Sequence, residues 1–313
     1  MSNKENRPKP ERGVIPENRK KLIGSLCIIG TTVCYGLIPS LSFLSFDAGV
    51  ATETLLFDKF FYAAMLMWAY IFIKKIPFKP DREAAPMLII ICISYIGIAT
   101  TLYLSFDYIS GSLATIISFT FPAMIIAIEM ITGMEPVRFV KITAVVLSML
   151  GLVLIVWTPH IRGNLTGIFF AFLTAVCYVI YIMGLSSKKI KKLNSITVAG
   201  YVLLSSAVFN MIRCALSGNP MFTRGTEQLV FMLLLAVICA FAAILLYCIG
   251  VKLLGAGNAA IINTFEPVLA CIFGYFLIGD VLTRNMIIGS AMVVMAVFIA
   301  NLPKKGYELK PGA

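Results

Sequence analysis

Apolar runs long enough to form membrane-spanning helices, separated by short polar segments, dominate this chain. The first run, Leu22–Phe46, contains no charged residue. It and nine later runs are each close to the roughly 20 residues that a helix needs to cross a bilayer core of about 30 Å. The later runs are approximately Thr54–Ile73, Ala84–Phe106, Tyr108–Gly133, Lys141–Trp157, Gly163–Ser186, Ser195–Cys214, Gln228–Gly250, Gly257–Gly279 and Asn285–Leu302. The pattern predicts ten transmembrane helices, with the boundary near Asp107 the least defined.

The composition supports lipid as the solvent for most of the chain. Hydrophobic residues make up 59% of the 313 residues and charged residues only 13%, whereas soluble domains average about 45–50% and 25%. A soluble fold of this length could not hide so much apolar surface. Strands do not explain the runs either, because no alternating pattern appears and lipid offers no partner for an open sheet edge. We therefore expect an all-α membrane protein.

The distribution of Lys and Arg predicts the orientation. Of these 26 residues, 21 fall in the tails and alternate loops on one side, one lies inside a helix, and four lie on the other side. The four are Arg162, Arg213, Arg224 and Arg284. By the positive-inside rule both termini are cytoplasmic, in a bacterial inner (plasma) membrane, with residues 1–21 and 303–313 as disordered or polar cytoplasmic tails. The cluster Lys188–Lys192 also fits a lipid-headgroup or regulatory patch.

Several function classes are disfavoured by what the sequence contains. The net charge of +11 comes from short loops without interleaved aromatic residues, so we expect no nucleic-acid partner. The eight cysteines form no CxxC pair and the single histidine is His160, so we expect neither a metal nor another cofactor. No GxxxxGK[ST] sequence is present, so ATP hydrolysis would require another subunit.

The chain aligns with itself in two blocks, which predicts an internal repeat. At a shift of 143, Gly24, Thr31, Val33, Cys34 and Tyr35 match Gly167, Thr174, Val176, Cys177 and Tyr178. At a shift of 145, Ala114, Ile116, Ile117 and Pro122 match Ala259, Ile261, Ile262 and Pro267. The repeats are residues 22–157 and 163–302. Because each holds five predicted helices, the second must be inverted relative to the first, as in many transporters.

One part of the second repeat resembles a known family. It comprises Gly255-Ala256-Gly257-Asn258-Ala259-Ala260, Glu266-Pro267-Val268, Gly279-Asp280 and Gly289. These residues resemble the second repeat of EamA-type proteins of the drug/metabolite transporter superfamily. The first-repeat equivalents are Gly111-Ser112-Leu113-Ala114, Phe121-Pro122 and Glu135.

The resemblance extends from residue 22 to about residue 302. It implies ten helices in two inverted halves, and members of the family include exporters of amino acids and other metabolites. The family often has Arg where this chain has Lys59, and Gly-Glu where it has Gly279-Asp280. These differences leave the class intact and weaken any inference about the substrate.

Glu266 is the strongest candidate for substrate binding, because charges within a bilayer are costly and need a reason. Pro267 removes a backbone hydrogen bond and frees the carbonyl of Asn263. A carboxylate beside such a kink can accept a proton or bind a substrate amine. The alternative is a structural carboxyl group bonded to another helix. Pro122 occupies the matching position in the first half, and paired breaks of this kind point toward a transporter's site, although packing alone can explain both.

Four further residues have both a functional and a structural interpretation. Lys59 is expected to face the site and meet a carboxylate from Glu266 or the substrate, or else to extend toward the membrane surface. Adjacent Asp58 points about 100° away and is expected to pair within the protein. Tyr35 and Tyr178 are candidates to line the site, with core packing as the alternative. Glu129 is expected simply to reach the membrane interface.

The sequence thus predicts a secondary transporter that exports a small metabolite, such as an amino acid, by alternating access. Its partners would be that substrate, the bilayer and, as a candidate coupling ion, the proton. The main alternative is a lipid or glycolipid flippase, which the same superfamily contains. A membrane-embedded enzyme is less favoured, because the charges are scattered. The sequence does not specify an oligomeric state.

Overall fold

The computed structural model describes residues 16–106, 108–109, 114, 117–133, 139–156, 164–279 and 282–300. Across these ranges the regular secondary structure is entirely helical. Seven helical segments there are long and apolar enough to span a membrane, and three shorter apolar helices of 10–17 residues accompany them. The chain is a multi-pass membrane protein, and the count of ten spans stays a prediction.

The helices follow the two halves expected from the sequence. The first half contains α1 (Glu17–Gly36), α2 (Ile38–Asp47), α3 (Thr52–Ile73), α4 (Ala85–Phe106), α6 (Phe121–Thr132) and α7 (Phe139–Val156). The second half begins with α8 (Leu165–Ser186), α9 (Lys188–Lys191), α10 (Ser195–Ser217) and α11 (Thr226–Leu234). It continues with the π-helix η1 (Leu235–Ala242), α12 (Ala243–Leu254), α13 (Ala256–Asn263), α14 (Glu266–Ile278) and α15 (Arg284–Ala300).

Two boundaries differ from the sequence-based expectation. Helix α1 begins at Glu17, so the end of the segment predicted as a disordered tail is helical. Polar residues such as Lys20 and Lys21 have high helix propensity, which lets the helix extend beyond its apolar part. The predicted loop after α8 contains the short helix α9, whose Ile190 is fully buried. The tail 303–313 and the motif residues 111–113, 135 and 280 lie outside the described residues.

Proline interrupts the membrane helices at matching places in the two halves. Pro122 and Pro267 each occupy the second position of a new helix, α6 and α14. Proline is tolerated there because the first-turn N–H groups have no partner within the helix. Before α14 the chain makes a tight turn in which the Phe265 amide bonds to the Ile262 carbonyl at 3.1 Å. The predicted ninth span is therefore two helices that meet at Glu266.

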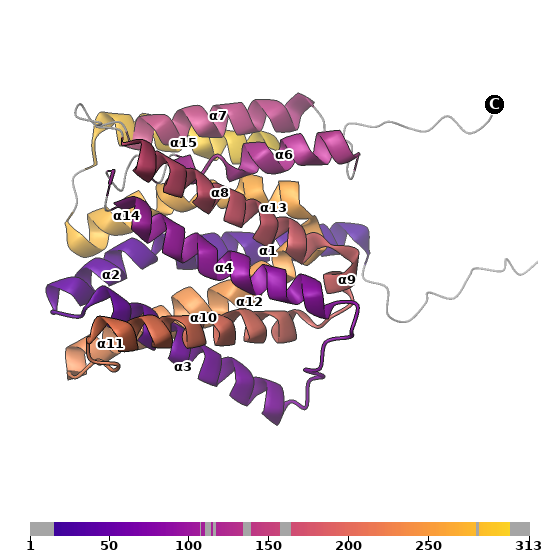
Figure 1. The fold of residues 1–313 in the computed structure, drawn as a ribbon. Helices are drawn as coiled ribbons and strands as arrows, with labels where there is room; N and C mark the ends of the chain where they lie inside the picture. Colours follow the sequence, from indigo (N-terminus) through magenta and orange to yellow (C-terminus); the bar gives the residue numbers. More distant parts are fainter. Residues whose placement is uncertain are drawn as a thin grey trace, which may run out of the picture.

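The helix boundaries repeat with nearly the same shift as the sequence blocks. Adding 145 to the bounds of α6 gives residues 266–277, and α14 spans Glu266–Ile278. The four most extensively packed helix pairs all join one half to the other: α7 with α15, α4 with α8, α3 with α10, and α1 with α12 (Figure 1). Since α1 corresponds to α8, and α4 to the segment from α11 to α12, the α1–α12 pair repeats the α4–α8 pair. This packing fits an inverted repeat.

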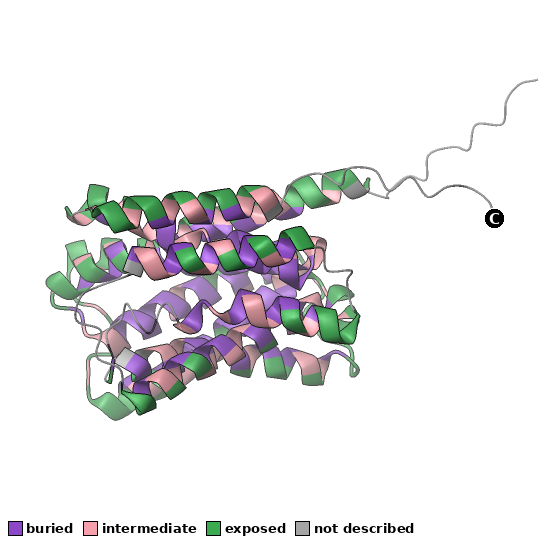
Figure 2. Ribbon diagram, turned by 90° about the horizontal axis from the view of Figure 1, so that it is seen from above, coloured by how far each residue is buried: buried purple, intermediate pink, exposed green. Residues whose placement is uncertain are grey.

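The core lies between the two halves, and the outer surface of the bundle is apolar. Figure 2 shows buried residues on the inward sides of the helices and exposed residues on their outer sides. Many of the exposed residues are large and hydrophobic, such as Ile131 and Phe276, as expected where lipid is the solvent. Helices α7 and α15 approach so closely at Gly151 and Gly289 that a Cβ on either would meet backbone of the other helix.

Candidate functional site

The carboxylate of Glu266 lies at the break between α13 and α14, near the middle of the span Ala256–Ile278. Glu266 is the first residue of α14, where unpaired backbone N–H groups and the helix dipole favour a negative charge. Its Oε2 accepts a hydrogen bond from Asn263 Nδ2 at 3.3 Å. The turn imposed by Pro267 thus brings the last residue of α13 next to the first residue of α14.

Asp58 and Lys59 are neighbours on α3 but serve different surroundings. Oδ2 of Asp58 accepts hydrogen bonds from Thr223 N at 2.9 Å and from Thr223 Oγ1 at 2.6 Å. Asp58 therefore fastens the segment between α10 and α11 to α3. The structure agrees with an internal partner for Asp58.

Lys59 points into the bundle rather than out to the membrane surface. Its side chain is only 7% exposed, and its Nζ lies 5.3 Å from the centre of the Phe60 ring. In the described part of the chain no carboxylate oxygen lies within 4.0 Å of this Nζ. A buried ammonium group with neither an ion pair nor a route to the surface is costly, and such a group is suited to meet a ligand.

Lys59 and Glu266 come from opposite halves and lie within electrostatic range of each other. Glu266 is also within range of the phenol groups of Tyr178 and Tyr247, and Lys59 of the thiol of Cys239 on η1. A π-helix is often found at functional sites, and here it places Cys239 beside Lys59. Two opposite charges thus face the centre of the bundle without a direct ion pair between them.

Tyrosine rings from four helices form a continuous row beside these charges. The Tyr95 and Tyr181 ring centroids are 5.1 Å apart, those of Tyr181 and Tyr247 5.8 Å, and those of Tyr247 and Tyr35 6.3 Å. Tyr178 stacks on Phe121, at 4.8 Å and 20°. The four rings of the row lie on α4, α8, α12 and α1, which are the helices of the two symmetry-related pairs.

Several polar atoms at this centre lack a partner within the described residues. The hydroxyl oxygens of Tyr181 and Tyr247 and Oδ1 of Asn263 are buried without a hydrogen bond. Buried polar groups in native proteins are nearly always satisfied. Together with the separated charges of Lys59 and Glu266, these atoms can bind a small polar molecule that carries groups of both signs.

The structure brings the predicted site residues together around one centre. Lys59, Glu266 and Asn263 meet there, Tyr35 joins through Tyr247, and Tyr178 lies within range of Glu266. The two prolines have unequal neighbours: Pro267 follows Glu266, whereas Pro122 follows the buried Phe121 that stacks on Tyr178. The arrangement of the backbone is repeated, but the charges are present on one side only.

Tyr95, Tyr181 and Tyr247 were missed at the sequence level. Tyr178 and Tyr181 are three residues apart, a spacing that places both on one face of a helix, and this spacing could have signalled Tyr181. Tyr95 and Tyr247 carry no comparable local signal, because a tyrosine in an apolar helix equally fits packing or the membrane interface. Only the meeting of α4, α8 and α12 assigns them to the site.

The expectation that Glu129 reaches the membrane interface was wrong. Glu129 is 3% exposed, and its Oε1 accepts a hydrogen bond from the Gly257 amide at 2.8 Å. Helix α6 packs against α13, so the carboxylate is covered by the second half and satisfies an N–H group of the first turn of α13. A Cβ at Gly257 would overlap the Glu129 carboxylate, which explains why glycine suits this position.

Comparison with known proteins gives the same class as the fold. The sequence model of the EamA-like transporter family matches residues 22–157 and 165–302. An "uncharacterized transporter" from Archaeoglobus fulgidus is 30% identical over 191 residues, which cover 60% of this chain and 66% of that protein, slightly under two thirds. A protein of known crystal structure shares the fold, with a TM-score of 0.76 and 15% identity over 90% of this chain and 97% of that one. With both repeats matched, this chain belongs to the EamA-like transporter family.

Proposed function

We propose that this protein is a secondary transporter whose substrate binds between Lys59 and Glu266. The observation that carries the proposal is that these two opposite charges face each other from the two halves without forming an ion pair. If their role were only structural, a direct ion pair would be the expected way to offset their burial. A substrate that inserts between them would instead supply a partner for each.

The substrate class that fits this arrangement is a small metabolite with both an amine and an acidic group, such as an amino acid. Its amine would meet Glu266 and its carboxylate Lys59. The free hydroxyls of Tyr181 and Tyr247 and the free oxygen of Asn263 would bond to the remaining polar atoms. The aromatic row beside them offers apolar surface for a side chain.

Alternating access is the mechanism that this geometry supports. The site lies at a helix break between two halves whose principal contacts are with each other, and small rocking of one half against the other would expose it to either side. Contacts between the halves hold both ends of the bundle: Gly257 with Glu129 at one end, and Thr223 with Asp58 at the other. Transport requires these contacts to break alternately.

We further propose ten spans, cytoplasmic termini and a bacterial inner-membrane location, with export as the direction. The driving force would be the proton gradient, through protonation of Glu266, or downhill flow of the substrate. A lipid flippase remains the alternative in the same superfamily. It would need a polar lateral path for a headgroup, and the groove between α4 and α10 on the outside of the bundle is lined almost wholly by apolar side chains.

The proposal is tested with the purified full-length protein in liposomes. A panel of amino acids and other small metabolites is first screened for thermal stabilisation, and those that stabilise are then tested for counterflow. We expect a zwitterionic compound to stabilise the protein and to show counterflow. Counterflow by none of the compounds, together with movement of a fluorescent phospholipid between leaflets, would instead establish the flippase.

A further inference from the structure

A groove on the outside of the bundle, between α4 and α10, has a shape and lining that the transport mechanism does not use. Its volume is about 640 Å³. Most of its walls are aliphatic, with Leu88, Ile89 and Ile93 from α4 and Leu204, Val208 and Ile212 from α10. Of these, Ile89, Ile93 and Val208 are among the exposed large hydrophobic residues. In a membrane protein such a groove must be filled by hydrocarbon.

The few polar groups in the groove are already satisfied within the protein. The Ser205 hydroxyl donates to the Val202 carbonyl at 3.0 Å, and the Tyr201 hydroxyl donates to the Phe78 carbonyl at 3.0 Å. Neither group therefore needs a polar ligand or water. The groove is chemically apolar along its length.

The length of the groove matches one leaflet of a bilayer. Its lining runs from Ala85 to Ile96 on α4 and from Tyr201 to Ile212 on α10. At about 1.5 Å per residue, each stretch is about 16 Å long. The hydrocarbon core of a bilayer is about 30 Å thick, so one leaflet contributes about half of that. The groove thus has the depth of one acyl chain.

The mouth of the groove lies at the end of the bundle that carries the basic loops. Its lining includes Pro80 and Ala85, where the loop from α3 enters α4. That loop and the segment around α9 lie at the same end of the bundle (Figure 1), and α9 packs against α4. Together they carry eight exposed cations and two acidic residues, a net charge of +6: Lys74, Lys75, Lys79, Arg82, Lys188, Lys189, Lys191 and Lys192 against Asp81 and Glu83.

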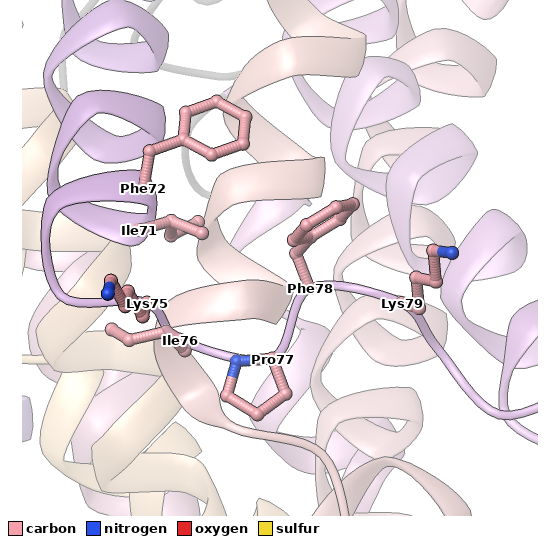
Figure 3. A pocket seen from close by; sticks show the side chains of 7 residues that line it. All are labelled: Ile71, Phe72, Lys75, Ile76, Pro77, Phe78 and Lys79. Atoms are coloured by element: carbon pink, nitrogen blue, oxygen red, sulfur yellow. The ribbon is translucent and has the colours of Figure 1, made fainter.

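The loop is held firmly beside the groove rather than left free. The Thr197 hydroxyl donates to the Pro77 carbonyl at 2.8 Å, and Tyr201, which lines the groove, holds Phe78. Figure 3 shows the smaller adjoining pocket of about 490 Å³, with Lys75 and Lys79 extending in opposite directions from the loop. Lys79 directly precedes Pro80 at the mouth of the groove.

Aromatic side chains mark this level as the membrane interface. Trp68, Phe72, Phe78 and Tyr201 form one cluster, with ring centroids 5.4–6.0 Å apart. Aromatic residues gather where lipid headgroups meet the hydrocarbon, and basic residues beside them attract anionic headgroups. The cluster therefore sets the depth at which a phosphate would lie.

We propose that the groove between α4 and α10 is a binding site for an anionic phospholipid. One acyl chain lies along the groove, and the phosphate contacts Lys79 at the mouth. Because α4 belongs to the first half and α10 to the second, the lipid bridges the two halves and stabilises their association. The proposal does not depend on what the transporter carries.

The test uses purified full-length protein in nanodiscs that contain phosphatidylglycerol or phosphatidylcholine with identical acyl chains. Native mass spectrometry measures the lipid that the protein retains. We expect the wild type to retain phosphatidylglycerol at least fivefold better than phosphatidylcholine. Lys79→Gln should reduce this preference to within twofold, whereas Lys20→Gln, the same charge change on α1 at the same end, should leave it unchanged.

Blocking the groove tests the acyl-chain part of the site. Ser205→Phe should lower retention of both lipids at least fivefold, whereas Val146→Phe, at an exposed position on α7, should not. A phosphatidylglycerol with a diazirine at the end of its acyl chain should label wild-type peptides around Ile96 and Ile212, which tests the site even if Ser205→Phe does not fold. Equal retention of the two lipids by the wild type, equal effects of Lys79→Gln and Lys20→Gln, or labelling confined to other helices would overturn the proposal.

Discussion

The backbone amide of Gly257 donates a 2.8 Å hydrogen bond to the carboxylate of Glu129, so an acidic residue of the first half satisfies the first turn of α13 in the second half. The contact is buried, and no side chain larger than hydrogen fits at Gly257 without displacing the carboxylate. It holds one end of the bundle closed in this conformation.

Removing this carboxylate should destabilise the protein. We expect Glu129→Ala to lower the free energy of unfolding by about 1.5–3 kcal/mol, the usual contribution of a hydrogen bond to a charged group. Thermal unfolding in detergent measures the change. Glu227→Ala removes an exposed carboxylate from the first turn of α11 and serves as the control. Equal melting temperatures for the two variants would show that the bond contributes nothing to closure.

Neutralising Glu266 should impair transport without unfolding the protein. Glu266→Gln keeps the size of the side chain and its hydrogen bond to Asn263, but it can neither ionise nor carry a proton. We expect transport into or out of liposomes to fall roughly tenfold or more, as loss of a charge-assisted contact implies. Any dependence of wild-type transport on pH should become flat in the variant. A variant with the wild-type rate and pH profile would make Glu266 a structural residue.

Changing Lys59 should separate its charge from its shape. Lys59→Ala should weaken binding of an anionic or zwitterionic substrate roughly tenfold or more, because the buried cation is lost. Lys59→Arg should retain part of the binding, since the charge stays although the group is bulkier. Lys74→Ala, an exposed residue at the other end of the same helix, is the control. Binding is measured by ligand-induced thermal stabilisation, and normal binding by Lys59→Ala would remove this residue from the site.

The orientation can be tested with cysteines introduced into intact cells. Because Lys and Arg are distributed 21 to four between the two sides, an impermeant maleimide added outside should label cysteines near Asp47 and Arg162. It should not reach cysteines near Lys189 or Gly312 until the membrane is permeabilised. Labelling at position 189 in intact cells would reverse the orientation that we propose.

Much of the architecture could be predicted from the sequence because it follows from local and repeated patterns. Apolar runs of the required length predicted a helical membrane protein, since lipid leaves no other way to satisfy the backbone. The matched prolines lie where the helices break in both halves, because the ring cannot donate a hydrogen bond wherever it occurs. The spacing did not show that α1 and α2 are separate helices, or that a π-helix precedes α12.

The candidate site could be predicted only in part. Lys59 and Glu266 stood out individually because each is a charge in an apolar segment, which is costly wherever it points. That they face each other without pairing depends on the packing of α3 and α14 around the centre. The burial of Glu129 likewise depends on the neighbouring α13, which no pattern on its own helix could indicate.

The sequence by itself determined the class of protein, the positions of most helices, the repeat and the costly charges, because these depend on the chemistry of segments that are continuous in the chain. The tertiary structure decided which charges meet, which tyrosines surround them and which carboxylate holds the halves together. Those relationships join residues more than a hundred positions apart, such as Glu129 and Gly257. They arise from the way helices of opposite halves pack, which side-chain shape and the close approach at glycines control.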